Sequence, residues 1–231
     1  MSEASEAPPP APWRLKGEML LSAWLVREGE LDPTMPPGWR PLRIAGRLLV
    51  GALWARYDAG GTLAYREFAV GVLLHRGLRL GVTVPWIWVD SERSLEGGRR
   101  LWSIPKRLAH FQTQRGRSSA GSVADAEGEV ARLQVTPAKM AWPRLAMWIA
   151  IAQPDVGQLL VARSRLSGTP RLAKADWRMR APLGALAGRP LLSLALAEAQ
   201  LVVGPAVSAP AMELRRALPP GSPAAPPGLP H

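Results

Sequence analysis

Apolar runs of strand length, separated by turns rich in glycine and proline, recur along most of this 231-residue chain. The clearest run follows the hairpin signal Asp58-Ala59-Gly60-Gly61, where Thr62–Leu74 alternates between two faces with the period of a β-strand. Tyr65, Glu67 and Ala69 share one of these faces. Similar runs are predicted at Glu18–Val26, Arg43–Tyr57, Leu78–Val89, Gly128–Thr136, Gly157–Leu166, Arg171–Met179 and Pro190–Val203. Many short strands of this kind indicate an α+β, mainly β fold built on a bent antiparallel sheet.

Two positions are expected to interrupt these strands. Pro85 divides Leu78–Val89, which is either a strand pair or one interrupted strand, because proline cannot donate to a strand ladder. Ser167-Gly168-Thr169-Pro170 has the composition of a turn and is predicted to separate two strands. The apolar run Leu145–Ala152 is too short for its periodicity to decide between helix and strand.

One short helix is predicted after the strand that ends at Val89. Asp90 or Ser91 can cap its first turn by accepting backbone N–H bonds. The helix should end before Pro105, because the residue before a proline disfavours helical geometry. Lys106 is therefore expected directly after the end of the helix.

Lys106 is the strongest candidate for a reactive side chain. Of the 29 basic residues only four are lysines, so the triplet Pro105-Lys106-Arg107 is unusual in this chain; the four are Lys16, Lys106, Lys139 and Lys174. Lysine can lose its proton and act as a nucleophile, whereas arginine stays charged. The neighbouring cation of Arg107 and apolar walls from Trp102 and Ile104 would each lower the pKa of Lys106. The plainer interpretation of such a triplet is a solvated turn.

Two motifs stand in a fixed register along the chain. The first comprises Asp90-Ser91-Glu92, Gly98-Arg99-Arg100 and Ile104-Pro105-Lys106-Arg107-Leu108. The second is Tyr65-Arg66-Glu67, which places Glu67 39 positions before Lys106 (106 − 67 = 39). Together they resemble the acetoacetate decarboxylase family, and a weaker likeness extends from Trp13 to Ala209.

The resemblance implies a role for several residues. Lys106 matches the family's Schiff-base lysine, Glu67 matches an acid of its active site, and Arg107 matches a second lysine while keeping the positive charge. Arg27 is the nearest match to an arginine that pairs with a pocket acid, and Ala52 stands where the family has a further acid. The pocket is therefore expected to be altered. By alternation alone, without the register to Lys106, a solvent-facing position of Glu67 beside an arginine is the favoured interpretation.

The resemblance implies a barrel-like acetoacetate decarboxylase-like fold with few helices, homo-oligomers and no cofactor. It also implies a decarboxylase of a small β-keto acid, such as acetoacetate, that acts through an iminium on Lys106. Two alternatives remain open at this level: an aldolase or dehydratase that uses the same iminium on another keto acid, and a non-catalytic ligand-binding member of the family.

Composition narrows the other function classes. The chain has no cysteine and three widely separated histidines, so no metal site is expected. A net charge of +11 would suit a nucleic-acid binder, but the arginines are dispersed and no nucleic-acid-binding motif is present. No uninterrupted apolar stretch of about 18 residues exists, which argues against a membrane span.

The two ends of the chain differ in composition from its centre. Residues 1–12 are rich in Ser, Glu, Ala and Pro, and residues 213–231 in Pro, Ala and Gly; both are predicted to be disordered. A single domain is predicted over residues 13–212. The acidic, proline-rich start is unlike a secretory signal, so a cytoplasmic protein is expected.

Overall fold

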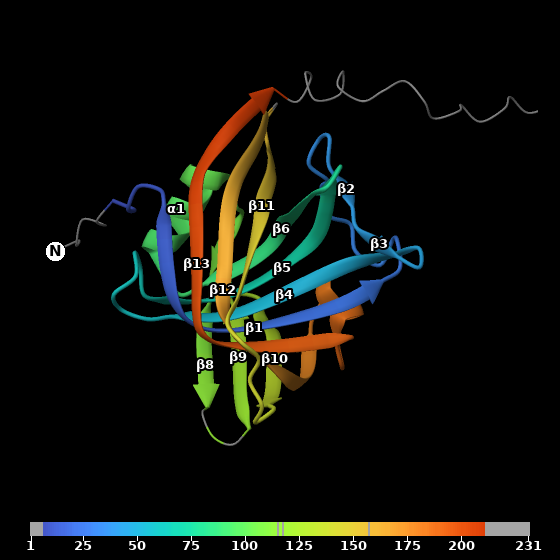
Figure 1. Cartoon of the computed structure of the whole chain (residues 1–231), viewed down its shortest axis with the longest axis vertical. Coiled ribbons are helices and arrows are strands. Elements are labelled where there is room, and N and C mark those ends of the chain that lie inside the picture. The colour runs from blue at the N-terminus through green and yellow to red at the C-terminus, as the bar shows by residue number, and fades with distance from the viewer. Residues whose placement is uncertain (1–6, 115, 117, 157, 211–231) are drawn as a thin grey trace, which may run out of the picture.

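The computed structural model describes residues 7–210 except 115, 117 and 157, and it is built mainly of strands (Figure 1). One α-helix, α1 (Glu92–Trp102), and one 3₁₀ turn, η1 (Leu183–Leu186), complete the described part. The strands are β1 (Trp13–Val26), β2 (Arg40–Pro41), β3 (Arg43–Ile44), β4 (Arg47–Tyr57), β5 (Tyr65–Arg76), β6 (Arg79–Val89), β7 (Lys106–Leu108), β8 (His110–Gln114), β9 (Ser119–Asp125), β10 (Gly128–Pro137), β11 (Leu145–Asp155), β12 (Gln158–Met179) and β13 (Leu192–Pro210). The prediction of a mainly β fold with few helices is confirmed.

Seven strands follow one another in a closed circuit of pairings. The order is β11, β6, β5, β4, β1, β13 and β12, and β12 pairs again with β11. Strands β10, β9 and β8 extend the sheet from β12. The pairing of β11 with β6 is the shortest in the circuit, with Ala150 opposite Gly81 and Ile151 opposite Val82. This closed circuit of strands is the barrel-like arrangement that the family resemblance implies.

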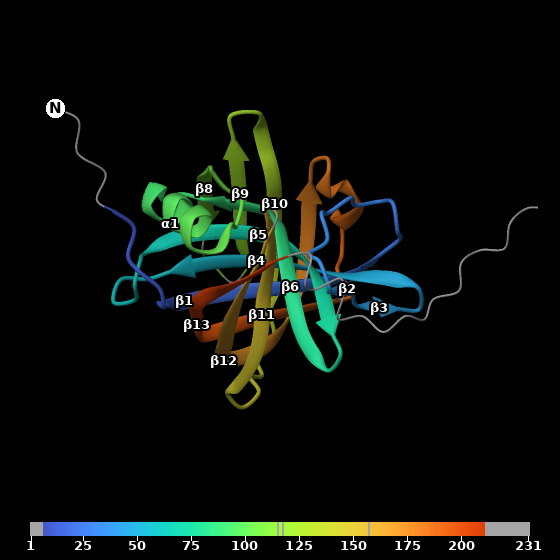
Figure 2. The ribbon, with the colours of Figure 1, turned by 90° about the horizontal axis from the view of Figure 1, so that it is seen from above.

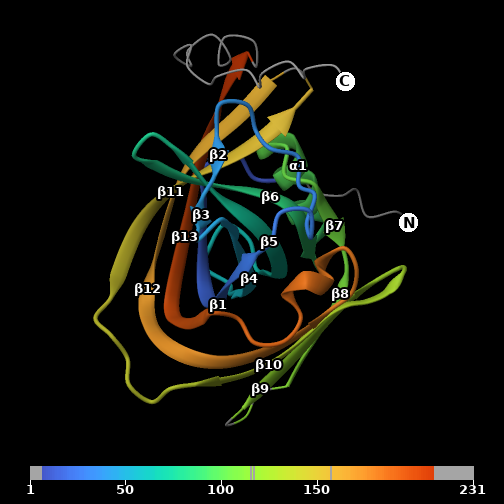
Figure 3. The same ribbon diagram turned by 90° about the vertical axis from the view of Figure 1, so that its right-hand side faces the viewer.

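Most neighbouring strands are antiparallel, as predicted, but the sheet is mixed. Both β7 and β11 pair in parallel with β6. Strands β12 and β13 bend strongly as they cross the molecule (Figures 1 and 3), so each contributes to more than one wall. Strand direction and bending of this kind depend on partners that lie far apart in sequence, which the period-two pattern does not specify.

The predicted turn Ser167-Gly168-Thr169-Pro170 is wrong, because β12 continues through it. The register between β12 and β13 shifts between Ser167 and Thr169, which marks a bulge. A Cβ on Gly168 would lie 3.3 Å from the backbone of Ala197 and Ala199, so the glycine allows a close approach of the two strands. Turn-forming residues at this point therefore bend a strand instead of ending it.

Three further segments, which the sequence left divided or unassigned, each form one continuous strand. Strand β6 runs through Pro85, and the register of its partner β5 shifts between Val70 and Val72 at the same level, so a bulge accommodates the proline. The unassigned run after Pro143 is β11, and the run after Pro190 is the single strand β13, which extends to Pro210.

The two faces of β5 belong to different hydrophobic clusters. Phe68 and Val70 pack with Trp88 and Trp177, and the Phe68 ring stacks on both indoles at centroid distances of 5.6 Å. Residues on the opposite face, beginning with Tyr65, join a second cluster that includes Trp13 and Trp102. The predicted alternation is confirmed, and it turns the side of β5 that carries Glu67 towards the inside of the strand circuit.

The N-terminal segment reaches α1 before the first strand begins (Figure 2). The carbonyl of Pro9 accepts a 2.9 Å hydrogen bond from the indole N–H of Trp13, and Gly97 of α1 faces Trp13 and Pro8. Residues 7–12 are thus placed, while the remainder of the predicted disordered segment 1–12 and the predicted tail 213–231 lie outside the described residues. No helix among the described residues has the length and apolar character needed to span a membrane.

Candidate active site

Helix α1 and the turn after it determine the position of Lys106. Ser91 is the N-cap, and its hydroxyl accepts a 3.2 Å hydrogen bond from the backbone N–H of Ser94. The helix ends at Trp102, and Ser103 adopts the left-handed conformation (φ 50°) that reverses the chain. Strand β7 then starts at Lys106, which pairs in parallel with Ile87 of β6. The predicted cap and helix end are confirmed.

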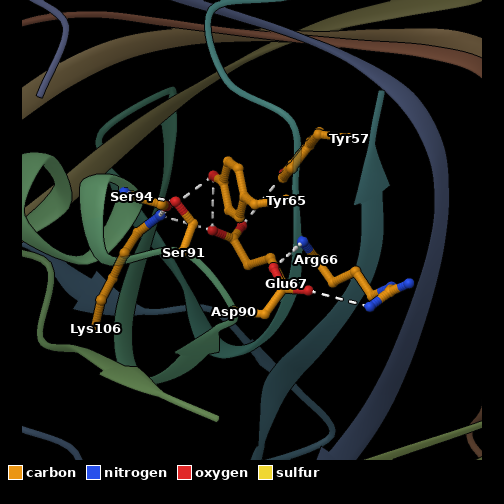
Figure 4. A network of polar contacts seen from close by, with 8 residues as sticks. All are labelled: Tyr57, Tyr65, Arg66, Glu67, Asp90, Ser91, Ser94 and Lys106. Carbon is orange, nitrogen blue, oxygen red and sulfur yellow. Dashed lines mark hydrogen bonds and ion pairs between the residues drawn. The ribbon is translucent and has the colours of Figure 1, made fainter. Parts of the chain in front are cut away.

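The ammonium group of Lys106 is surrounded by three oxygen atoms (Figure 4). Nζ donates to Glu67 Oε2 at 2.7 Å, to Ser94 Oγ at 2.9 Å and to the hydroxyl of Tyr65 at 3.3 Å. Only 3 % of Lys106 is exposed. The solvated-turn interpretation of this lysine is therefore wrong, and its amine is held in one orientation by residues from β5 and α1.

Glu67 is buried as deeply as its partner, with 5 % exposure. Its two carboxylate oxygens accept hydrogen bonds from the hydroxyls of Tyr57 at 3.2 Å and Tyr65 at 3.1 Å. Burial raises the pKa of both phenols well above 10.0, and the negative charge of Glu67 raises it further. Both tyrosines therefore remain hydrogen-bond donors, and the interpretation of Glu67 as a solvent-facing residue is wrong.

A glycine of the helix makes room for the lysine side chain. A Cβ on Gly98 would lie 2.6 Å from both Cδ and Cε of Lys106, so any larger residue would displace the lysine stem. Nζ lies 5.8 Å from the centroid of the Trp13 ring and 5.0 Å from that of Tyr65. The guanidinium of Arg99 donates a 2.9 Å hydrogen bond to the carbonyl of Lys106. Both the backbone and the side chain of the lysine are thus fixed.

Lys106 and Glu67 line a cavity of about 360 Å³ inside the strand circuit. Trp102 and Ile104 form part of its wall, as predicted, and Ala52 lines it as well. Most of the other lining side chains are apolar and come from β1, β4, β5, β6, β11, β12 and β13. An amine and a carboxylate side by side in such a cavity form an arrangement suited to covalent and proton-transfer chemistry on a small carbonyl compound.

The two arginines expected to support the site lie elsewhere. Arg107 is exposed, with its guanidinium 6.0 Å from the centroid of the Trp88 ring, because successive residues of β7 point to opposite faces. Arg27 follows the end of β1 and forms an ion pair with Glu30 at 3.0 Å, with 73 % of its side chain exposed. Neither residue lines the cavity.

Sequence reasoning missed two residues of the site, Tyr57 and Ser94. Tyr57 lies directly opposite Tyr65 across the predicted hairpin, so the turn at Asp58 held the information needed to find it. Ser94 belongs to a helix whose orientation depends on tertiary packing, and no local signal marks it. Among residues 7–210, with the three gaps noted above, no group of three His, Asp or Glu side chains is placed to hold a metal ion.

Comparison with known families agrees with this geometry. Residues 1–175 match the model of the acetoacetate decarboxylase family. The chain belongs to the acetoacetate decarboxylase family. Among curated proteins, by contrast, none matches the sequence.

Solved structures of acetoacetate decarboxylase-like proteins share the fold. An acetoacetate decarboxylase superposes with a TM-score of 0.70 at 14 % identity over 89 % of this chain and 92 % of its own. The enduracididine biosynthesis enzyme MppR gives 0.67 at 16 % identity over 90 % and 91 %. The acetoacetate decarboxylase of Legionella pneumophila gives 0.65 at 14 % identity over 90 % and 91 %. At these identities the structural likeness establishes the fold. The match to the family model makes this chain a relative of the keto-acid enzymes that the family contains.

Proposed function

We propose that the protein decarboxylates a small β-keto acid, such as acetoacetate, through a Schiff base on Lys106. The observation that carries the proposal is the position of the Lys106 amine, which is buried at the wall of a cavity and 2.7 Å from the carboxylate of Glu67. A carboxylate at this distance can take the ammonium proton, and the neutral amine can then attack a carbonyl carbon.

The reaction proceeds in balanced steps. The amine of Lys106 adds to the ketone, and the resulting carbinolamine loses water as Glu67 returns the proton, which leaves an iminium. The bond between the α-carbon and the carboxylate breaks, carbon dioxide departs, and the electron pair passes through the α-carbon to the iminium nitrogen to give an enamine. A proton that ultimately comes from solvent is added to the α-carbon. Water then releases the ketone and restores the amine.

The surroundings of the site favour the step that loses carbon dioxide. The iminium and the substrate carboxylate carry opposite charges, whereas the enamine and carbon dioxide are neutral. An apolar cavity solvates the charged state poorly, so the loss of charge lowers the barrier. Tyr65 and Ser94 keep the nitrogen of Lys106 in place, and Tyr57 orients the carboxylate of Glu67.

A second candidate is an aldolase or dehydratase that uses the same iminium. MppR shares the fold, and structures of it contain pyruvate and the condensation product of pyruvate with imidazole 4-carboxaldehyde. The altered pocket at Ala52 is compatible with either reaction. The two candidates differ in their products: a decarboxylase releases carbon dioxide from acetoacetate, whereas an aldolase joins pyruvate to an aldehyde.

Borohydride trapping tests the proposal. The protein is incubated with acetoacetate or pyruvate, reduced, digested and analysed by peptide mass spectrometry. We expect an added mass on Lys106 and none on the Lys106→Met variant, while Lys16→Met, which removes an exposed lysine of β1, keeps the adduct. A folded protein that gives no adduct with any keto acid would favour a non-catalytic ligand-binding member of the family instead.

We also propose that the protein forms homo-oligomers, as the family resemblance implies. Several large apolar side chains of β11 are exposed, among them Met147 and Trp148, and a second copy would cover such a surface. Sedimentation velocity checks this proposal, and a monomer at micromolar concentration would refute it.

A further inference from the structure

The geometry points to a substrate with a hydrocarbon substituent longer than the methyl group of acetoacetate. We infer that the keto acid of this enzyme carries an alkyl chain, which lies in the apolar cavity while the carbonyl carbon reaches Lys106. This inference rests on the proposed function and specifies the substrate class of the same site.

The polarity of the cavity wall is the first argument. Of the described lining residues, Glu67 and Lys106 are charged, and they pair with each other. The remaining wall is made mainly of Leu, Ile, Val, Ala, Met and Trp side chains. A small polar acid would leave most of this apolar surface in contact with water, whereas an alkyl chain would bury it at a gain of roughly 25 cal/mol per Å².

The size of the cavity is the second argument. Its volume of about 360 Å³ lies within the range of roughly 300–1,000 Å³ typical of pockets that enclose drug-sized ligands. Taking about 30 Å³ for a water-sized group, the cavity has room for about twelve such groups. Acetoacetate would occupy only about half of that space by the same measure.

The direction of the cavity is the third argument. Across neighbouring strands Trp13 lies opposite Val203, and Val203 lies opposite Ser164, so these residues form a row that begins at Trp13, whose ring centroid lies 5.8 Å from Nζ of Lys106. Further along β1, Ala23 lies opposite Leu192 of β13. Leu192 is 45 % exposed although it lines the cavity, so the cavity reaches solvent at the end away from Lys106. An alkyl chain can therefore extend from the lysine towards this opening.

A buried hydroxyl gives the substrate head a second contact. Ser164 lines the cavity with no exposed surface, and its Oγ has no hydrogen-bond partner among the described residues. A buried hydroxyl without a partner is costly unless a ligand or water supplies one. Ser164 lies two strands away from Trp13, and we infer that the carboxylate of a substrate in the cavity supplies the missing partner of its hydroxyl. The head and the chain of the substrate thus have separate regions of the cavity.

A chain-length series tests the inference. The value of kcat/KM is measured for acetoacetate, 3-oxohexanoate and 3-oxooctanoate, each combined with borohydride trapping on Lys106. Because burial of one methylene contributes about 0.8 kcal/mol, we expect kcat/KM to rise about fourfold per added methylene, and about 250-fold over the four methylenes between acetoacetate and 3-oxooctanoate. Trapping of acetoacetate on Lys106 with a flat or falling series would overturn the inference and leave the proposed function intact. Absence of trapping with all three acids would overturn both.

Two variants, one of them with a matched control, test where the alkyl chain and the carboxylate of the substrate bind. Ala23→Phe adds bulk at the far end of the cavity and should lower the ratio of kcat/KM for 3-oxooctanoate to that for acetoacetate at least tenfold. Val207→Phe adds the same bulk at an exposed position of β13 and should leave the ratio unchanged. Ser164→Ala should raise KM about tenfold or more, and by the same factor for all three acids, because it removes a hydrogen bond to the substrate carboxylate. An unchanged ratio in Ala23→Phe would refute the placement of the chain.

Discussion

The buried ion pair between Lys106 and Glu67 makes a quantitative prediction about stability. The two side chains are 4 % and 6 % exposed, and Nζ lies 2.7 Å from Oε2. Removing one member of a buried pair leaves the other charge without compensation, which costs about 3–5 kcal/mol. We therefore expect Lys106→Met and Glu67→Gln each to lower the free energy of unfolding by about this amount at neutral pH.

The double variant Lys106→Met/Glu67→Gln should recover most of the loss. It leaves no uncompensated charge. The amide oxygen at position 67 can accept a hydrogen bond from one of the two tyrosine hydroxyls, and the amide NH2 can donate to the oxygen of the other. Replacing both members of a buried pair by neutral groups is often close to neutral in free energy. The coupling energy between the two positions should therefore be at least about 2 kcal/mol.

Urea unfolding of the parent, the two single variants and the double variant measures this coupling. The slopes of the four unfolding curves should agree, so that midpoints can be converted to free energies. Two single variants that each cost less than about 1 kcal/mol, and whose effects add in the double variant, would refute the reasoning. Such a result would mean that water reaches the pair and weakens the interaction between the charges.

Two further predictions concern the surroundings of the pair. The chain has only two tyrosines, Tyr57 and Tyr65, and burial and then the charge of Glu67 raise both pKa values, so no tyrosinate absorption should appear near pH 10 in the folded protein. The phenols of the unfolded state ionise first as the pH rises. The contribution of these two phenols to stability is therefore complete below pH 10.0 and is lost as the pH rises through their folded-state pKa. Tyrosinate absorption at 295 nm that appeared near pH 10 in the folded protein would contradict this. Gly98→Ala should reduce kcat at least tenfold, because the new methyl group would displace the Lys106 stem, whereas Gly184→Ala, which has open space around it, should retain activity. Equal activity of the two glycine variants would refute the close packing at position 98.

The sequence allowed the centre of the site to be predicted because local rules act there. Alternation along β5 placed Glu67 on the same face as Tyr65, and the cap at Ser91 together with Pro105 limited the helix before Lys106. The spacing of the two motifs then related the acid to the amine. These features depend on residues that are close to one another in sequence, or on the fixed spacing of 39 positions between the two motifs that resemble the family.

The remaining features depend on contacts between distant segments. The bulge of β12 at Gly168 coincides with a close approach of β13, and a single sequence does not distinguish it from a turn. The outward position of Arg107 follows from the pairing of β7 with β6, which makes a strand of a segment for which the sequence had predicted only the end of the preceding helix. Ser164 became a candidate only when its row across β13 and β1 was known.

The short pairing between β6 and β11 has a consequence for how the protein moves. Elsewhere in the circuit long ladders join the strands, but here only Gly81 with Ala150 and Val82 with Ile151 close the wall. Local opening is easiest where the fewest backbone bonds must break. Val82 and Ile151 also line the cavity, so parting of this seam would widen the interior without unfolding the rest of the sheet. The same two strands would then act as a gate. The amide hydrogens bonded across this seam should exchange faster than those of the ladder between β1 and β4, and they should slow down when a long-chain ligand is bound.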